Sequence, residues 1–147
     1  MEIYSIGFTQ KTAEQFFGIL KHAGIRRLVD VRLNNVSQLA AFAKRDDLRY
    51  FLREICGAEY VHEPLLAPTQ ELLDGLKKNK GPWAEYEAGF LSLMRERRVE
   101  EQLAPPLLLE MPTALLCSEP TAECCHRRLV LEYLRERWCA DFEIVHL

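Results

Sequence analysis

The amino-acid sequence predicts a single α/β domain over residues 1–147, doubly wound, with about five mainly parallel strands flanked by helices. Short apolar runs alternate with amphipathic stretches along the chain. The first three of these segments form a strand–helix–strand unit within about 30 residues. A helix that connects two strands in this way usually joins parallel strands. No repeat, low-complexity tract or linker divides the sequence. We therefore expect one domain built on one sheet.

The first unit is a strand, a helix and a second strand. EIYSIG, residues 2–7, is a short apolar run that ends at a glycine, which predicts a strand. A helix follows over 11–24, because Thr12 is suited to cap its start and Gly24 is suited to end it. RRLVDVR, residues 26–32, predicts a buried second strand. The apolar residues of the helix fall at helical spacing: Ala13, Phe16, Phe17 and Leu20.

A polar loop, residues 33–47, separates this unit from the next helix. We expect that helix to begin near Asp46 or Asp47 and to carry its apolar face in LRYFLREIC, residues 48–56. The third strand lies in GAEYVHEP, residues 57–64, which opens with a helix-stopping glycine and closes at a proline.

Two further helices are predicted in the middle of the chain. The first lies within 66–81, and the second is a long amphipathic helix over 82–103 that the proline pair at 105–106 breaks. The aromatic residues at helical spacing on the second helix, which we expect in the core, are Trp83, Tyr86 and Phe90.

The last unit is again a strand, a helix and a strand. TALLC, residues 113–117, predicts the fourth strand. A helix is expected from about Pro120 to Arg137, with Leu129, Val130, Tyr133 and Leu134 on its buried face. DFEIVHL, residues 141–147, predicts the final strand.

Composition narrows the class of protein. The net charge of −3 gives no bulk basic field for nucleic acid. The basic run at Arg95–Arg98 has acidic neighbours, which is typical of a solvated helix face. No apolar run approaches the roughly 20 residues of a membrane span, and the N-terminus predicts a strand rather than a secretory leader. We expect a cytoplasmic protein whose five cysteines are free thiols.

Polar residues follow the predicted strands at the point where each strand ends. Ligands of open parallel sheets bind beyond the carboxyl ends of the strands. We therefore expect a site at this edge of the sheet. The residues delivered there are Asp30, Arg32, Asn34, Asn35, His62, Glu63, Cys117, Ser118 and Glu119.

The segment CSEPTAECCHRRLV, residues 117–130, adds the start of a helix to that edge. Helix N-termini favour anions, and arginine side chains suit phosphate or carboxylate. His126, Arg127 and Arg128 lie in the first turns of the predicted helix. The segment therefore indicates an anion-binding strand, loop and helix with thiols at its rim.

The cysteines of this segment have two interpretations. A thiol near a helix N-terminus or a cationic side chain ionises readily, so Cys117 or Cys125 is a candidate nucleophile or redox thiol. His126, Glu119 and Asp30 would then handle protons. The alternative is that the cysteines are small packing residues. For Cys124 we favour packing; for Cys117 and Cys125 both interpretations stay open.

Other chemistries receive less support. Cys117, Glu119, Cys125 and His126 are metal-ligand types, but their spacing matches no paired CxxC zinc pattern, and we assign no metal or cofactor. A phosphatase-type loop needs an arginine six residues after its cysteine, where this chain has Glu123. No GxGxxG, GxxxxGK[ST] or GxSxG motif occurs.

These observations favour an enzyme acting on a phosphorylated or otherwise anionic small molecule or nucleotide. The alternative is a non-catalytic module that binds a ligand or a nucleic acid through the same arginines. In a third interpretation, Asp30 forms a structural ion pair, for which Arg127 is the expected partner, in a buried network with Glu119. The residues expected to bind the anion are Arg32, Asn34, Asn35, Arg127 and Arg128.

YSIGFTQKT, LVDVRLNNVSQ and LLCSEP followed by CHRRLV resemble the bacterial and archaeal family known as domain of unknown function 488. The resemblance covers nearly the whole chain and implies a compact α/β domain with these motifs gathered together, without an established reaction. Phe8 stands where many members have histidine, and LNNVSQ follows DVR where many have a proline-containing basic stretch. The ligand of this chain is expected to differ accordingly.

Overall fold

The computed structural model describes residues 1–119 and 122–147. A five-stranded sheet with strand order β3-β2-β4-β1-β5 forms its centre, and every pair of neighbouring strands is parallel. This confirms the predicted α/β class and the parallel sheet. The strands are β1 (Glu2–Gly7), β2 (Arg27–Asp30), β3 (Glu59–His62), β4 (Thr113–Cys117) and β5 (Glu143–His146).

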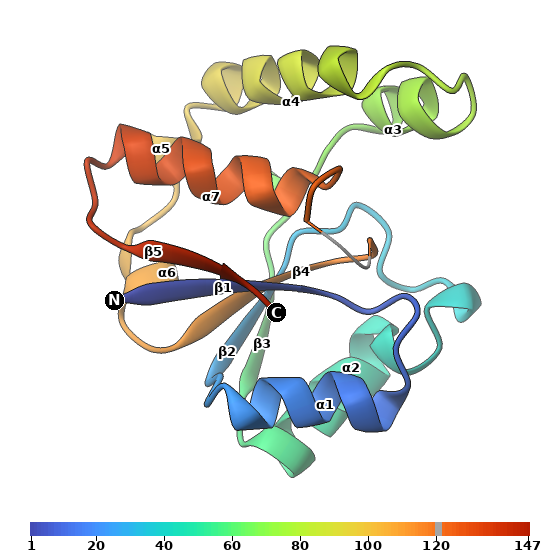
Figure 1. Ribbon diagram of the computed structural model, residues 1–147, viewed down its shortest axis with the longest axis vertical. Helices are drawn as coiled ribbons and strands as arrows, with labels where there is room; N and C mark the ends of the chain where they lie inside the picture. The colour runs from blue at the N-terminus through green and yellow to red at the C-terminus, as the bar shows by residue number, and fades with distance from the viewer. Residues whose placement is uncertain (120–121) are drawn as a thin grey trace.

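Helices cover both faces of the sheet (Figure 1). α1 and α2 lie on one face, and α3, α4, α5 and α7 lie on the other. The helices are α1 (Ala13–His22), α2 (Arg45–Phe51), α3 (Gln70–Lys77), α4 (Trp83–Arg97), α5 (Val99–Gln102), α6 (Pro106–Leu109) and α7 (His126–Arg137). Shorter helical turns are η1 (Gln38–Ala43), the π-type turn η2 (Leu52–Cys56) and η3 (Pro64–Leu66).

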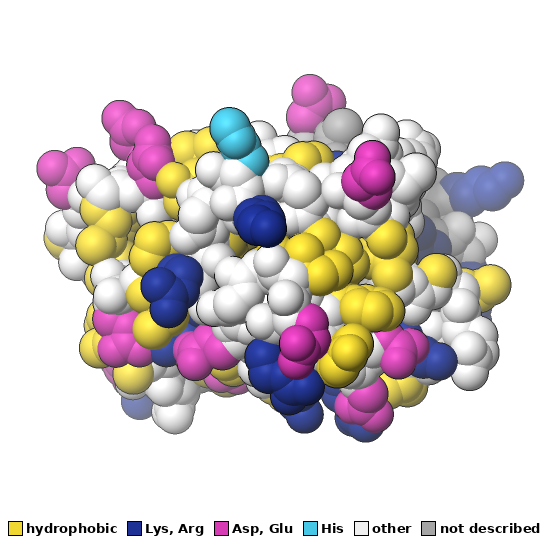
Figure 2. All heavy atoms as spheres, turned by 90° about the horizontal axis from the view of Figure 1, so that it is seen from below, with side chains coloured by type: hydrophobic (Ala, Val, Ile, Leu, Met, Phe, Trp, Pro, Cys, Tyr) yellow, Lys and Arg dark blue, Asp and Glu magenta, His cyan; other side chains and the backbone are white. Residues whose placement is uncertain are grey.

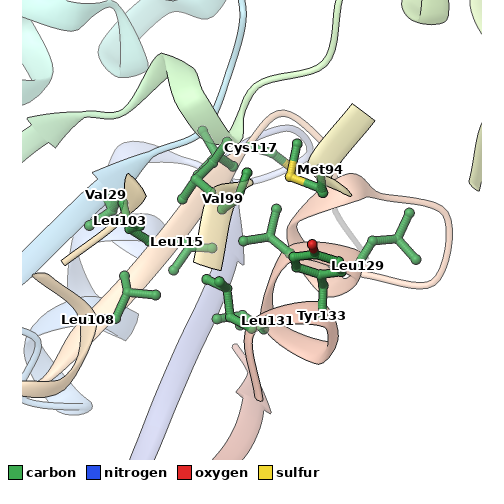
Figure 3. Packing of buried hydrophobic residues seen from close by; sticks show 14 of the residues in the cluster. Val29, Met94, Val99, Leu103, Leu108, Leu115, Cys117, Leu129, Leu131 and Tyr133 are labelled. Carbon is green, nitrogen blue, oxygen red and sulfur yellow. The ribbon is translucent and has the colours of Figure 1, made fainter. Parts of the chain in front are cut away.

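The strand residues alternate between two hydrophobic cores, because successive side chains of a strand point to opposite faces. In β4, Leu115 and Cys117 pack beneath α7, whereas Ala114 and Leu116 pack toward α1. Figure 3 shows Cys117 at the margin of the first core, among buried aliphatic residues. This alternation decides which side chains from different strands meet.

The local signals for α1 operate as predicted. The hydroxyl of Thr12 accepts from the backbone N–H of Gln15, and the Gln15 side chain accepts from the backbone N–H of Thr12. This capping box satisfies two donors that the first turn leaves free. Phe16, Phe17 and Leu20 are buried against the sheet.

Two helices differ from the prediction. The long helix ends at Arg98, whose φ of 52° is left-handed, and α5 continues in a new direction. α7 begins at His126 rather than near Pro120, so Cys124 precedes the helix and Cys125 is its N-cap residue. Pro120 and Thr121, where the start was predicted, lie outside the described residues. Apolar periodicity located the body of the helix, but it carried no signal for this first turn.

Hydrophobic side chains reach the surface on the side of α1 and α2, where they lie between charged ones (Figure 2). Tyr50 and Ile55 are exposed there. Within the described residues, no helix has the length and apolar character needed to cross a membrane.

Candidate functional site

A cavity of about 370 Å³ opens at the carboxyl ends of β2 and β4, with residues of α3 and α4 among its walls. Several of the residues predicted from the sequence line it, together with others that were not predicted. The predicted ones are Arg32, Asn34, Cys117, Ser118, Glu119, Cys125 and His126. The others include Gln70, Asp74, Lys77, Lys78, Trp83, Tyr86 and Cys124.

Cys117, Cys125 and His126 form a buried group at the cavity wall, which we call the sulfur–imidazole cluster. One potential ligand atom from each of the three lies within 4.8 Å of the others. The two sulfur atoms are in contact, as in a disulfide. The sequence predicted five free thiols and carried no signal that these two would meet. Cys56, Cys124 and Cys139 are free.

The backbone around the two contacting cysteines is wide for a disulfide. Their Cα atoms are 7.6 Å apart, whereas the Cα atoms of a disulfide usually lie about 4.4–6.8 Å apart. Two sulfur atoms that share a third partner do not require so short a Cα separation. The backbone therefore favours two converging thiols over a covalent link.

Strand and helix ends position this cluster. Cys117 is the last residue of β4, and Cys125 and His126 are the N-cap and first residue of α7. The Nε2 atom of His126 lies 2.7 Å from the carbonyl oxygen of Val31, and its ring packs beside Phe90. Burial lowers the pKa of His126 to about 4, and the neighbouring Arg127 charge acts in the same direction. The imidazole is therefore neutral near pH 7.

Arg127 lies behind the cluster and is completely buried. Its Nε donates to the hydroxyl of Ser5, and its Nη1 donates to the carbonyl of Glu119 and to Sγ of Cys117, both at 2.8 Å. Burial lowers the pKa of Arg127 to about 10, so the guanidinium still carries its charge at neutral pH.

No carboxylate forms an ion pair with Arg127 among residues 1–119 and 122–147. A buried charge without a counter-charge is strongly destabilising. The sulfur of Cys117 is the contacting group that becomes an anion by losing a proton. A disulfide would leave the guanidinium without compensation, so the charge balance favours a Cys117 thiolate.

Gly7 allows these segments to approach one another. It pairs with Cys117 across β1 and β4. A Cβ atom at this position would overlap the carbonyl oxygen of Glu119 and would lie 3.2 Å from Nη1 of Arg127. Glycine is therefore required here by close packing, because the backbone of Glu119 lies directly against the end of β1.

Asp30 pairs with Arg32, and the expected pair with Arg127 is wrong. The Nε and Nη2 atoms of Arg32 each donate to the Asp30 carboxylate at 2.8 Å. Tyr60 donates to the same carboxylate at 2.6 Å, and Asn35 contributes a longer contact. Asp30 faces the α1 side of the sheet, while Arg127 extends from α7 on the opposite side. The alternation along β2 therefore separates them.

Arg32 connects this ion pair to the cavity. It also donates to the carbonyl of Ala43 at 2.7 Å, and its guanidinium lies 5.2 Å from the ring centre of Phe8. Its Nη1 is buried and has no hydrogen-bond partner in the described part of the chain. The ring of Phe8 thus packs against the guanidinium of Arg32.

The remaining predicted residues are held by other side chains. Arg128 pairs with Glu132 and faces away from the cavity lining, and Asn35 bonds to Tyr60 beneath Arg32. Glu119 lines the cavity but forms an ion pair with Lys77. The structure therefore brings Arg32, Asn34 and the sulfur–imidazole cluster together at the cavity and places Asp30, Asn35 and Arg127 behind its wall.

An aromatic wall was missed from the sequence. The rings of Trp83 and Tyr86 stack with centroids 5.1 Å apart, and both residues line the cavity. Their helical spacing predicted the core, and Tyr86 and Phe90 are indeed buried while Trp83 is half-buried. The basic run LKKNK, residues 76–80, is the sequence feature from which this side of the cavity could have been inferred, because Lys77 and Lys78 line it.

Comparison with known proteins gives one match. A sequence model of the family described as "Domain of unknown function DUF488" matches residues 12–134, which is most of the chain. The comparisons with curated proteins and with solved structures found no significant match. The matched range contains the whole of the sulfur–imidazole cluster together with Asp30, Arg32 and Arg127.

Proposed function

The chain belongs to the DUF488 family, and we propose that it is an enzyme acting on an anionic small molecule that carries a planar ring. Nucleotides and related phosphorylated compounds are the substrate class. The observation that carries the proposal is that the sulfur of Cys117, which accepts from the buried guanidinium of Arg127, lies at the wall of a ligand-sized cavity. A volume of 370 Å³ falls within the range of small-molecule pockets.

The cavity is suited to hold an anion near Arg32. This side chain is 3% exposed and its Nη1 has no partner among the described residues. A phosphate or carboxylate would satisfy that donor by a charge-assisted hydrogen bond. Lys77 and Lys78 lie at the more exposed rim and add positive charge, which Glu119 and Asp74 partly offset.

The aromatic wall is suited to hold a ring. The ring of Trp83 stacks on that of Tyr86, and both residues line the α4 side of the cavity. Base–aromatic stacking is worth about 1–3 kcal/mol per base and tolerates different bases. Burial raises the pKa of Tyr86, and the Glu119 charge raises it further, so its phenol keeps its proton at neutral pH.

The reactive centre in this proposal is the sulfur–imidazole cluster. An anionic sulfur close to a neutral imidazole offers a nucleophile or a ligand for an electrophile, and both are common in enzymes. A pure binding module would need only the arginine and the aromatic wall. The paired thiols at the cavity favour the enzyme over the module.

The first test is ligand binding. Nucleotides and sugar phosphates would be screened by thermal shift, since a ligand at 100 times its dissociation constant stabilises the fold by about 2.7 kcal/mol. Trp83→Ala is expected to weaken binding of the ring-containing ligands, and Trp138→Ala, whose indole binds the carbonyl of Glu100, is the matched control. Equal loss in both variants, or no stabilising anion at all, would contradict the proposal.

The second test is turnover of the ligands that bind. Product formation is expected with the wild-type protein and is expected to fall at least tenfold in Cys117→Ser. Cys139→Ser is the control and should retain activity, because Cys139 is exposed and does not line the cavity. Binding by Trp83 and Arg32 without turnover of any bound compound would instead establish the non-catalytic module. Turnover that survives the loss of Cys117 would remove the cluster from the reaction.

A further inference from the structure

We propose that Cys117, Cys125 and His126 bind a thiophilic divalent metal ion, Zn²⁺ being the best fit, with one coordination position open to the cavity. This inference specifies the reactive centre of the proposed function, and for that role of the ion it rests on the proposal. Binding of the metal itself does not depend on the substrate class.

The donor set is the first argument. Two cysteine sulfurs and one imidazole nitrogen are ligands that zinc prefers, and a Cys₂His set with a fourth, exchangeable position is a known catalytic arrangement. The three donor atoms already lie within 4.8 Å of one another. Zinc–sulfur and zinc–nitrogen bonds of about 2.0–2.3 Å place tetrahedral ligand atoms within this range.

The second argument is the tautomer of His126. A backbone carbonyl only accepts hydrogen bonds, so the 2.7 Å contact with Val31 requires that Nε2 of His126 carry the proton. Nδ1 of the neutral ring is then left with a lone pair for a ligand. Histidines that bind metals usually donate their other ring N–H to a carbonyl or a carboxylate, and this orients the ring.

The third argument is charge. Zinc binds cysteines in the thiolate form, and Arg127 donates from Nη1 to Sγ of Cys117 at 2.8 Å, which favours the negative sulfur and makes the arginine an outer partner of that ligand. Cys125 is the N-cap residue of the twelve-residue helix α7, whose N-terminal dipole favours a negative sulfur. Each thiolate therefore has its own stabilising partner in the fold.

The fourth argument is the backbone separation. The Cα atoms of Cys117 and Cys125 are 7.6 Å apart, which is too far for a relaxed disulfide and suits two sulfurs that share an ion. The sequence spacing of the three ligands did not indicate a metal site. One ligand is the last residue of a strand and two are at the start of a helix, so they do not form a paired CxxC motif.

The open position follows from the surroundings. All three ligands line the cavity, and within the described residues only these three form such a group. Cys124 is exposed on the same cavity and lies outside the group. Structural zinc sites are usually closed by four protein ligands, so three ligands beside a cavity indicate an exchangeable fourth position.

The experiment is metal analysis of the full chain purified in reductant without chelator, followed by Co²⁺ substitution. We expect about one metal ion per chain and, with Co²⁺, the near-ultraviolet thiolate-to-metal absorption and visible d–d bands of tetrahedral coordination. Cys125→Ser and His126→Gln are expected to lower the Co²⁺ affinity at least tenfold, consistent with the loss of a ligand. Cys124→Ser is the matched control and should retain the spectrum.

If a variant fails to fold, metal binding can still be tested on the wild-type protein by its thermal unfolding. Chelation is expected to lower its unfolding midpoint, and Zn²⁺ is expected to restore it. Absence of bound metal together with no thiolate absorption on adding Co²⁺ would overturn the proposal. So would a Cys117–Cys125 disulfide recovered from the metal-exposed, reduced protein, or equal loss of affinity in Cys124→Ser.

These outcomes separate the two proposals. Metal stoichiometry and Co²⁺ spectra are measured without any substrate, and binding of anionic compounds is measured on the metal-free protein through Arg32 and Trp83. Metal binding without a stabilising anion would leave the metal site intact and defeat the substrate class. Anion binding by a protein that binds no metal would support the substrate class and contradict the metal site.

Discussion

The guanidinium of Arg127 donates a hydrogen bond to the sulfur of Cys117 at a distance of 2.8 Å, in a fully buried setting. The two residues are ten positions apart, at the end of β4 and the start of α7. The arginine also bonds to Ser5 and to the carbonyl of Glu119, so it joins β1, β4 and α7 at one point. The side chain of Arg127 thus connects three elements of the fold and stabilises a negative charge on the sulfur of Cys117.

Replacing Arg127 by methionine is expected to lower the free energy of unfolding by about 3–5 kcal/mol, because it leaves a buried anionic sulfur without its partner. Urea unfolding would measure the change. Arg128→Met is the matched control, since Arg128 forms a partly exposed pair with Glu132 and its loss should cost no more than about 0.5 kcal/mol.

A double-mutant cycle sharpens this test. In a Cys117→Ala background the cost of Arg127→Met should differ from its cost in the wild type by about 0.5–3 kcal/mol, because contacting residues are energetically coupled. Strict additivity of the two changes would show that the contact carries no charge interaction.

Tyr60→Phe is expected to reduce stability at pH 7 by about 1.5–3 kcal/mol, because Tyr60 donates to the buried Asp30 carboxylate. Burial and the Asp30 charge raise the pKa of Tyr60 above its ordinary value of 10. The unfolded chain therefore loses this proton at lower pH than the folded protein does. The contribution of Tyr60 is complete below pH 10 and falls as pH rises above it.

The measurement is urea unfolding of the wild type and of Tyr60→Phe from pH 7 to pH 11. The stability difference between them should narrow above pH 10. A difference that stayed constant over this range would show that the phenol ionises equally in both states.

Gly7→Ala is expected to destabilise the protein by about 1–3 kcal/mol, because the added methyl group overlaps the carbonyl oxygen of Glu119 and forces the backbone to shift. Gly18→Ala in α1 is the control, and it is expected to increase stability. A Cβ atom at Gly18 meets no heavy atom within 4 Å, and alanine is favoured over glycine within a helix by about 0.5–1 kcal/mol. Thermal unfolding of both variants compares the two; similar midpoints would contradict the close approach.

Local sequence patterns determined the elements of this fold. The apolar runs of β1, β2 and β4 are properties of neighbouring residues, and so are the Thr12 cap and the helical spacing in α1. The sequence therefore shows them directly. The rule for parallel sheets also placed Arg32, Asn34 and Cys117 at one edge, where a single cavity now joins them.

The partners of the side chains at that edge depend on the three-dimensional path of the chain. The sequence suggested that Asp30 pairs with Arg127, but the two-residue alternation of β2 turns Asp30 toward Tyr60 and Arg32 on the opposite face from α7. It likewise gave no sign that Cys117 and Cys125 meet, because their contact depends on how the end of β4 and the start of α7 are placed relative to each other. Propensity and periodicity act over a few residues, whereas the meeting of a strand end with a distant helix start depends on the whole chain path.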